Sequence, residues 1–484
     1  MRCPPHARAD VGPVACPPIA ASGRWSGLLV RAWLLAMAAS GCVAGQADDA
    51  APRPDVVFLL ADDLGWGDVG FHGGVAATPH LDQLARDGLE LGCHLVAPVC
   101  SPTRVSLLTG RWWSRFGVVD PQNERALPWE TRTLPRALAE AGYATALVGK
   151  WHLGSRPGEL PNRFGFDTSY GSLAGGVTSF THRYKNGPFT HTWHRDGGLI
   201  TEQGHVTDLI AAEAVRRIEA LAVPAADRRP YFLYVPFTAV HLPVQEPADW
   251  LARVPAGIDG AVARHYAACI MHLDDAVGRI LAALDKAGTR GRTLVVFTSD
   301  NGASSVANTG QDYPPDGSPP GPIPGCNRPF RGGKETLYEG GVRVPTVVSW
   351  PGHVRPGRVD APVQIADWMP TLCRFAGHAA DGDPSADGID NGGLLTSHEP
   401  PPERLLYAVG PGWQSRAVRR GDWKLIVTAA AEGRPERCEL FDLGADPAEA
   451  HDRAADEPAV VNRLRAAMTA AAARDNESRV VAER

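Results

Sequence analysis

The chain has 484 residues, a formal net charge of −6, and 44% hydrophobic against 21% charged residues. It is too long for one small domain, so we expect a large α/β unit with a smaller unit beside it. The composition is that of an ordinary globular protein. The slightly acidic balance gives no reason to expect a nucleic-acid partner.

The first fifty residues have the pattern of an export signal followed by a linker. A short apolar run at residues 33–39 follows two arginines and precedes small residues and Cys42. This order is typical of a signal peptide, and the run is far short of the roughly 20 residues that a membrane span needs. Residues 39–42 also resemble a relaxed bacterial lipoprotein box, with Cys42 as the lipid anchor. We expect an exported protein, either freely secreted or held in the periplasm or at the outer membrane as a lipoprotein.

From residue 56 onward, strand patterns alternate with helix patterns. The first strand is a continuous β-branched and aromatic run, typical of a strand buried on both faces of a parallel sheet. The alternation predicts an α/β sandwich with a large, mostly parallel sheet flanked by helices. We expect strands at 56–60, 144–148, 231–235 and 294–298, and helices at 81–90, 134–141, 208–221 and 266–287.

The last part of the chain has a different pattern. Residues 378–402 are a loop-like connector, and a hairpin is expected at 417–426, with a short strand and a helix beyond it. This predicts a small C-terminal α+β subdomain with an antiparallel sheet. The predicted division is an export segment and linker at 1–50, a catalytic domain at 51–380 and the subdomain at 400–476.

Oxygen-bearing side chains follow two of the predicted strands. Asp62 and Asp63 come just after the first strand, and Asp300 and Asn301 just after the strand at 294–298. In open α/β sheets, ligands bind at the edge formed by the carboxyl ends of the strands. Three carboxylates that meet there would repel one another without a cation, and oxygen ligands suit calcium or magnesium. Either pair alone could simply cap a helix or form a turn.

Cys100 lies at the start of a further predicted helix. Pro102 and the apolar spacing after it mark the first turn. A helix N-terminus favours negative charge, and Arg104 returns to the face of Cys100 one turn later. A lone cysteine is usually a small buried hydrophobic residue, and a thiolate is a poor partner for a hard cation. The conflict disappears if Cys100 does not remain a cysteine.

Six segments in the right order resemble the formylglycine-dependent sulfatase family. Residues 100–104 match the Cys-x-Pro-x-Arg core that the formylglycine-generating enzyme recognises. The resemblance runs from about residue 54 to 377 and implies the alkaline-phosphatase-like sandwich fold of that family. The other matching segments are the rest of the first signature to residue 111, the second signature at 149–154, the metal segments at 61–68 and 298–302, and the lysine segments at 331–334 and 338–343.

The resemblance implies how the metal and residue 100 work. Cys100 would be oxidised to formylglycine (3-oxoalanine), with the formylglycine-generating enzyme as a maturation partner. One Ca²⁺ would be held by residue 100 and by the side chains at the two strand ends. One hydroxyl of the hydrated aldehyde, deprotonated by Asp300, would attack sulfur. The metal ligands implied are Asp62, Asp63, Cys100 in its modified form, Asp300 and Asn301.

The resemblance also implies roles for the remaining catalytic residues. Lys150 and Lys334 would bind the sulfate oxygens. His241 would protonate the leaving alcohol, and His152 would take the proton of the second hydroxyl to expel sulfate. Arg104 would orient residue 100. Without these motifs, each histidine would more often be a packed or surface residue.

Several core segments look most like arylsulfatase B-type enzymes, which remove the 4-sulfate from N-acetylgalactosamine in chondroitin and dermatan sulfate. Specificity depends on loops, and the candidates here are residues 180–194 and 303–330, with Trp413 as a further stacking surface. Packing within the loops is an equal alternative for their aromatic residues. We expect a sulfated polysaccharide or oligosaccharide as substrate, with N-acetylgalactosamine 4-sulfate in a glycosaminoglycan as the first choice.

Two other functions fit parts of the pattern. Phosphonate and phosphodiester hydrolases share the fold and the modified residue, but differ around the second signature and the late lysine segment. A non-catalytic binder of sulfated glycans would have lost a metal ligand or Cys100, and all of these are present. Sulfate ester hydrolysis therefore remains the prediction.

Overall fold

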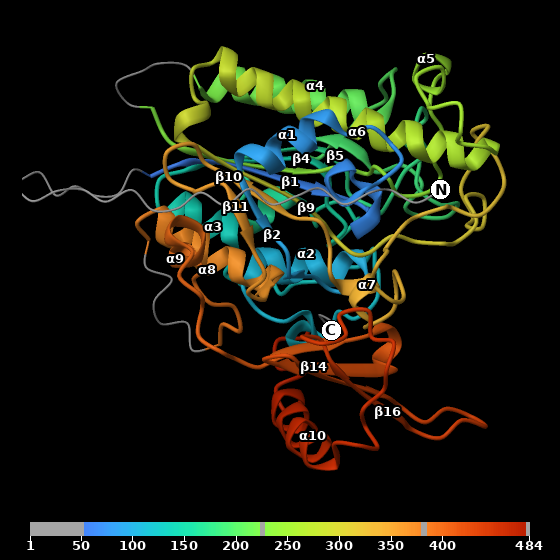
Figure 1. Cartoon of the computed structure of the whole chain (residues 1–484). Helices are drawn as coiled ribbons and strands as arrows, with labels where there is room; N and C mark the ends of the chain where they lie inside the picture. Colours follow the sequence, from blue (N-terminus) through green and yellow to red (C-terminus); the bar gives the residue numbers. More distant parts are fainter. Residues whose placement is uncertain (1–52, 223–227, 379–384, 481–484) are drawn as a thin grey trace, which may run out of the picture. The chain divides into compact units, whose positions relative to one another are not determined.

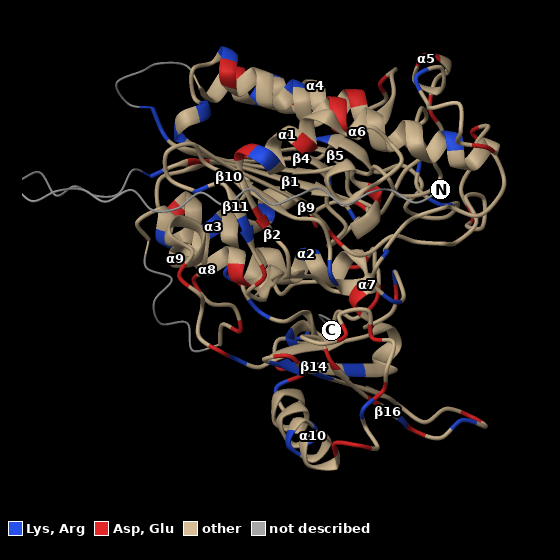
Figure 2. Cartoon of the chain, in the orientation of Figure 1, with Lys and Arg blue, Asp and Glu red and all other residues tan. Residues whose placement is uncertain are grey.

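The computed structural model describes residues 53–222, 228–378 and 385–480. The predicted export segment, including Cys42, lies outside these residues, so export and lipid attachment stay predictions. None of the helices in the described ranges is long and apolar enough to span a membrane. Basic and acidic residues are interspersed along the ribbon (Figure 2).

A ten-stranded sheet forms the centre of the fold (Figure 1). Its five middle strands are parallel, and antiparallel pairs occur toward both edges, so the predicted mostly parallel sheet is confirmed. In spatial order the strands are β11 (Gly357–Val359), β2 (Leu89–Leu91), β10 (Val347–Ser349), β9 (Thr293–Ser299), β1 (Asp55–Ala61), β8 (Tyr231–Pro236), β4 (Ala144–Lys150), β5 (Thr168–Ser172), β6 (Trp193–Arg195) and β7 (Gly198–Leu199).

The position of strand β1 determines where the predicted metal ligands lie. All seven of its residues are buried, as its continuous apolar run predicts for a strand covered on both faces. It pairs in parallel with both β8 and β9, and Ala61 lies opposite Ser299. The residues that follow β1 and β9 therefore leave the sheet at the same edge.

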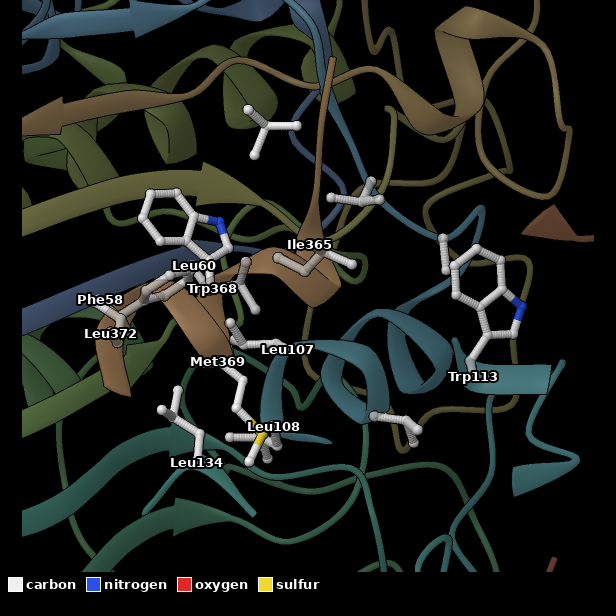
Figure 3. Close-up of a cluster of buried hydrophobic side chains, with 14 of the residues drawn as sticks. Phe58, Leu60, Leu107, Leu108, Trp113, Leu134, Ile365, Trp368, Met369 and Leu372 are labelled. Carbon is white, nitrogen blue, oxygen red and sulfur yellow. The ribbon is translucent and has the colours of Figure 1, made fainter. Parts of the chain in front are cut away.

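Helices cover both faces of the sheet (Figure 1). Alternate β1 residues pack into two separate apolar clusters, one on each face. Figure 3 shows the first cluster, in which Phe58 and Leu60 of β1 pack near Trp368 and Leu372. That cluster includes α2 (Cys100–Thr109), α3 (Leu134–Glu140) and α8 (Trp368–Phe375), and the other includes α1 (Pro79–Asp87), α4 (Val206–Leu221) and α6 (Ala261–Lys286).

The predicted helix at 81–90 is wrong at its C-terminal end. Helix α1 ends at Asp87, and Leu89 and Glu90 belong to β2. The physical reason is Gly88, where a Cβ atom would lie 2.5 Å from the carbonyl oxygen of Val348. Only glycine allows the chain to approach β10 so closely at the point where the helix ends.

A four-stranded antiparallel sheet follows near the C-terminus, in agreement with the predicted α+β subdomain (Figure 1). The expected hairpin at 417–426 is the β14–β15 pair. The strands are β13 (Leu406–Val409), β14 (Ser415–Arg420), β15 (Trp423–Thr428) and β16 (Arg437–Asp442), and α10 (Pro458–Ala472) contacts β14 and β15.

A buried ion cluster ties this small sheet to the segment that follows Lys334. Lys424 of β15 lies 2.7 Å from Glu339, the first residue of the short helix α7 (Glu339–Val342), and 2.9 Å from Glu449. All three side chains are buried. Buried carboxylates are tolerated only with such partners. Lys424 therefore offsets the negative charge of Glu339 and Glu449 between the small sheet and α7.

We predict that Lys424→Met lowers the free energy of unfolding by about 3–5 kcal/mol, because it leaves two buried carboxylates without their lysine. The measurement is equilibrium urea unfolding. The control is Lys286→Met, which removes an exposed ion pair with Glu219 and should cost no more than about 1 kcal/mol. Equal losses in the two variants would contradict the prediction.

Candidate active site

The side chains after β1 and β9 meet at one edge of the sheet, as the sequence predicts. The backbone N–H of Asp63 donates to an Asp300 carboxylate oxygen at 3.2 Å. The side-chain amide of Asn301 donates to Asp63 at 2.7 Å. The side chains of Asp62, Asp63, Asp300 and Asn301 are all buried, at no more than 3% exposed. Three carboxylates in such a place need compensating positive charge.

Each of the three carboxylates has a cationic partner from a different element. Lys150 ends β4, Arg104 lies on α2, and Lys334 belongs to the segment after the long loop at 303–330. These pairs hold the catalytic residues that the sequence predicts in one place. The nitrogen-to-oxygen distances are 2.6 Å for Lys150–Asp62, 2.7 Å for Arg104–Asp300 and 2.7 Å for Lys334–Asp63.

The environment shifts the pKa values of these groups in different directions. Burial opposes ionisation of Asp63, but the charge of Lys334 outweighs it and holds the pKa of that carboxyl below its usual range. Burial and the negative charge of Asp62 raise the pKa of Asp300 to about 6. Burial opposes the charge on Lys150, while Asp62 raises its pKa overall. Of Asp63 and Asp300, Asp300 is thus better suited to accept a proton near neutral pH.

Cys100 is the first residue of α2, and its Sγ lies 3.2 Å from Nδ1 of His152. Burial raises the pKa of the Cys100 thiol. Burial and the charge of Lys150 lower the pKa of His152 far below its ordinary value. The pair is therefore a neutral thiol beside a neutral imidazole, and an uncharged thiol is a weak nucleophile. As a cysteine, residue 100 is badly suited to chemistry at this place.

Helix α2 is fixed to the strand ends by the residues around Cys100. The hydroxyl of Thr103 donates to the carbonyl oxygen of Asp300 at 2.6 Å, and Arg104 donates to the carbonyl oxygen of Lys150 at 2.9 Å. The hydroxyl of Ser101 donates to the carbonyl oxygen of His152 at 3.0 Å. The sequence did not indicate the roles of Ser101 and Thr103, because these residues stand at the variable positions of the Cys-x-Pro-x-Arg motif.

His241 approaches the same centre from the segment after β8. Its Nε2 lies 3.8 Å from an Asp63 carboxylate oxygen, and its Nδ1 hydrogen-bonds the carbonyl oxygen of Leu242. Burial and the charge of Lys334 lower the pKa of His241 to about 3. The neutral ring therefore donates through Nδ1 and directs Nε2 toward the site.

Two glycines that the sequence analysis did not single out lie against the histidines. A Cβ atom at Gly175 would be 3.1 Å from Nε2 of His152, and one at Gly176 would be 2.5 Å from Nδ1 of His241. A larger residue at 176 would displace the His241 ring, and one at 175 would press against the His152 ring. The sequence shows only a Gly-Gly pair at this point, and this pair does not indicate that two histidine rings lie against it.

The donor set fits a hard cation. Oδ1 of Asp62 and Oδ1 of Asn301 are buried and lack a hydrogen-bond partner among the described residues. Asp62, Asp63 and His241 can each offer an atom, and these atoms lie within 4.8 Å of one another. Free, buried carboxylate and amide oxygens are ligands of calcium or magnesium. Asp62, Asp63, Asp300 and Asn301 would hold such an ion, together with residue 100.

The two loops singled out as specificity candidates meet beside this centre. The backbone N–H of Asn186 donates to the carbonyl oxygen of Asp312 at 2.7 Å, and its side chain donates to the Asp312 carboxylate at 2.8 Å. The rings of Tyr184 and Tyr313 pack edge to face with centroids 5.9 Å apart. Tyr313 donates to the carbonyl oxygen of Gly176 at 3.1 Å. We call these contacts the loop clasp.

A polar cavity of about 500 Å³ opens next to Lys334. It has room for sugar rings and carries hydroxyl, amide and charged groups. Trp413, by contrast, packs against the large apolar cluster, which favours the packing alternative for that residue. Cavity-lining polar residues include Ser304, Ser305, Gln311, Asn327, Arg328 and Glu335.

Comparison with known proteins agrees with this geometry. Residues 54–378 match the sulfatase family. The chain is 30% identical to mouse arylsulfatase J over 85% of this chain and 74% of that protein. It is 34% identical to pig N-acetylgalactosamine-6-sulfatase over 77% of this chain and 70% of that protein.

Solved structures are similar over most of the chain as well. Ps i-CgsB in complex with k-i-k-neocarrahexaose superimposes with a TM-score of 0.76 and 29% identity, over 87% of this chain and 93% of that one. At 87% of this chain, the similarity is longer than the matched family region. The buried carboxylates, their three cations and Cys100 lie within residues 54–378, and the chain belongs to the sulfatase family.

Proposed function

We propose that this sulfatase hydrolyses sulfate esters of a carbohydrate, with residue 100 as formylglycine and one Ca²⁺ at the sheet edge. The observation that carries the proposal is the position of Cys100, 3.2 Å from His152, among three carboxylates and three cations. A neutral buried thiol has no evident use there. A hydrated aldehyde at the same position would offer two hydroxyl groups.

The groups around residue 100 have defined tasks in this proposal. The hydrated form supplies the oxygen that attacks sulfur, and the sulfur–oxygen bond to the sugar breaks. Lys150 and Lys334 bind the sulfate oxygens, where charge is largest. Bound Ca²⁺ would supply Lewis-acid polarisation and neutralise the carboxylates. Arg104, paired with Asp300, keeps the proton acceptor in place.

Two proton transfers complete the cycle. An anionic ester bound beside His241 raises the pKa of its imidazole, so Nε2, which faces Asp63, takes up a proton from solvent as the substrate binds. His241 then gives this proton to the leaving sugar oxygen. His152 is neutral and can accept the proton of the second hydroxyl. The carbon–oxygen bond to sulfate then breaks, sulfate leaves and the aldehyde is restored.

Maturation must come before folding is complete. Cys100 is 1% exposed and lies against His152 in the finished structure. A maturation enzyme can therefore reach it only while the segment around Cys100 is still unfolded. The formylglycine-generating enzyme is the proposed partner at that stage.

A carbohydrate substrate is supported by the polar cavity beside Lys334. One similar solved structure holds a neocarrahexaose, and one relative is named for N-acetylgalactosamine 6-sulfate. We propose N-acetylgalactosamine 4-sulfate in a glycosaminoglycan as the first substrate to test, with the 6-sulfate beside it. Release of sulfate from simple aryl esters alone, with none from any sulfated glycan, would contradict a carbohydrate substrate.

Cys100→Ala should abolish sulfate release and leave the thermal unfolding midpoint nearly unchanged, because the thiol is a small buried group. The matched control is Cys438→Ala, a partly buried thiol on β16, which should retain activity. The measurement is sulfate release by ion chromatography. Turnover by the Cys100→Ala enzyme would refute the assigned nucleophile.

His241→Ala should slow hydrolysis of a sugar sulfate by about 10²–10⁴-fold, the usual contribution of a general acid. Hydrolysis of 4-nitrophenyl sulfate should fall much less, because nitrophenolate leaves without a proton. The measurement is kcat for both esters. An equal loss for both would assign His241 to sulfate binding instead of proton donation.

Calcium should stabilise the protein against heat, because it binds the folded state only. At a calcium concentration a hundredfold above Kd, the free energy of unfolding should rise by about 2.7 kcal/mol. Asp62→Asn should lose this gain, while the exposed Asp249→Asn should keep it. The measurement is differential scanning calorimetry with and without chelator, and equal gains in both variants would place the ion elsewhere.

A further inference from the structure

Lys185 is an unusual cation beside the active site. It lies near the tip of a hairpin-like turn in which Arg183 bridges to His191. The residues on either side of Lys185 form the loop clasp: Tyr184 packs on Tyr313, and Asn186 binds Asp312. The backbone of Lys185 is therefore held next to the centre.

The clasp is itself fixed to the catalytic histidines. A Cβ atom at Gly175 would meet both the Tyr184 ring at 2.9 Å and the His152 ring at 3.1 Å, so both rings lie against this glycine. Tyr313 reaches the neighbouring Gly176. These contacts place residue 185 at the rim of the site, on the side of His152 and His241.

Among the described residues, no carboxylate forms an ion pair with Lys185, and the ionisable groups that act on it are Lys334, Lys150 and the Cys100 thiol. The ammonium group lies over the Tyr184 ring, with Nζ 5.7 Å from the centroid. The side chain is half-buried. Burial and the positive charges of Lys334 and Lys150 lower its pKa. A half-buried ammonium group that faces other cations is unfavourable unless an anion lies close to it.

The scissile sulfate alone does not supply that anion. Inside the centre, three carboxylates already balance Arg104, Lys150 and Lys334. A divalent cation and a sulfate monoester together add net positive charge to that balance. Lys185 adds one more. A second negative group on the substrate would neutralise the charge of Lys185 at the rim.

We propose that Lys185 is a specificity-determining residue that binds a second anionic substituent of the glycan, close to the sulfate ester that is cleaved. This rests on the proposed function and narrows it to sulfated glycans that carry two acidic groups near each other. The shared chemistry is a carboxylate or sulfate oxyanion that accepts hydrogen bonds from an ammonium group. A uronate on the next sugar and a second sulfate on the same sugar are its two sources.

The test compares three substrates with the matured full-length enzyme. One carries a single sulfate on a neutral oligosaccharide, one adds a neighbouring uronate, and one adds a second sulfate instead. Lys185→Met should raise KM about tenfold for the doubly anionic substrate that is recognised, with kcat within twofold. It should leave KM for the singly sulfated substrate unchanged. The doubly anionic substrate whose KM rises shows whether the second anion is a uronate or a sulfate.

Two further variants separate charge recognition from loop structure. Lys185→Arg keeps the positive charge and should retain most of the wild-type preference. Lys286→Met, an exposed lysine on α6, should behave as wild type. The KM difference between Lys185→Met and wild type should also shrink as salt concentration rises, since salt screens a half-exposed pair.

The outcomes are distinguishable. An equal rise in KM for all three substrates would overturn the proposal and assign Lys185 to the scissile sulfate or to the loop fold. Unchanged KM for all three would also overturn it. If wild type desulfates no glycan at all, the proposed function fails. Binding of the three glycans to Cys100→Ala, measured by calorimetry with and without Lys185→Met, would then still decide the role of Lys185.

Discussion

The structure depends on balancing buried charge at one edge of the sheet. Asp62, Asp63 and Asp300 are carried to this edge by parallel strands whose ends lie in register. Without cations they would repel one another strongly, because all three side chains are buried. Three cations from β4, from α2 and from the segment around Lys334 make the arrangement stable. The rest of the fold positions these six side chains.

The same balance supports the proposal that residue 100 is chemically converted. A cation at the edge would find free oxygens on Asp62 and Asn301, which suit a hard ion. A thiol would be the one soft group in that set, and its raised pKa keeps it neutral. Conversion of Cys100 to an aldehyde hydrate would complete an all-oxygen set and provide a nucleophile at the same position.

Much of the fold and of the centre could be predicted because they depend on local patterns. The buried run at 56–60 predicted a central parallel strand, and the sheet-edge rule predicted that Asp62 and Asp300 would meet. Helix α1 was predicted too long, because helical periodicity does not reveal that Gly88 must approach β10. The short edge strands have too few residues to show a period.

The parts of the site that the sequence did not predict depend on how loops meet. The Asn186–Asp312 and Tyr184–Tyr313 contacts join residues more than 120 positions apart, and no spacing in the sequence indicates them. Gly175 and Gly176 matter only because two histidine rings lie against them. Substrate specificity commonly depends on loops of this kind, whereas the predicted chemistry depends on the strand ends, so the reaction was easier to predict than the substrate.

The most direct test of the account is to measure how activity depends on the chemical state of residue 100. Preparations matured to different degrees would be analysed by mass spectrometry of the peptide that contains residue 100, and by sulfate release per mole of protein. The account predicts that sulfate release rises in proportion to the formylglycine fraction and is zero when that fraction is zero. Desulfation by protein that contains only cysteine at position 100, or full conversion with no desulfation of any ester, would contradict it.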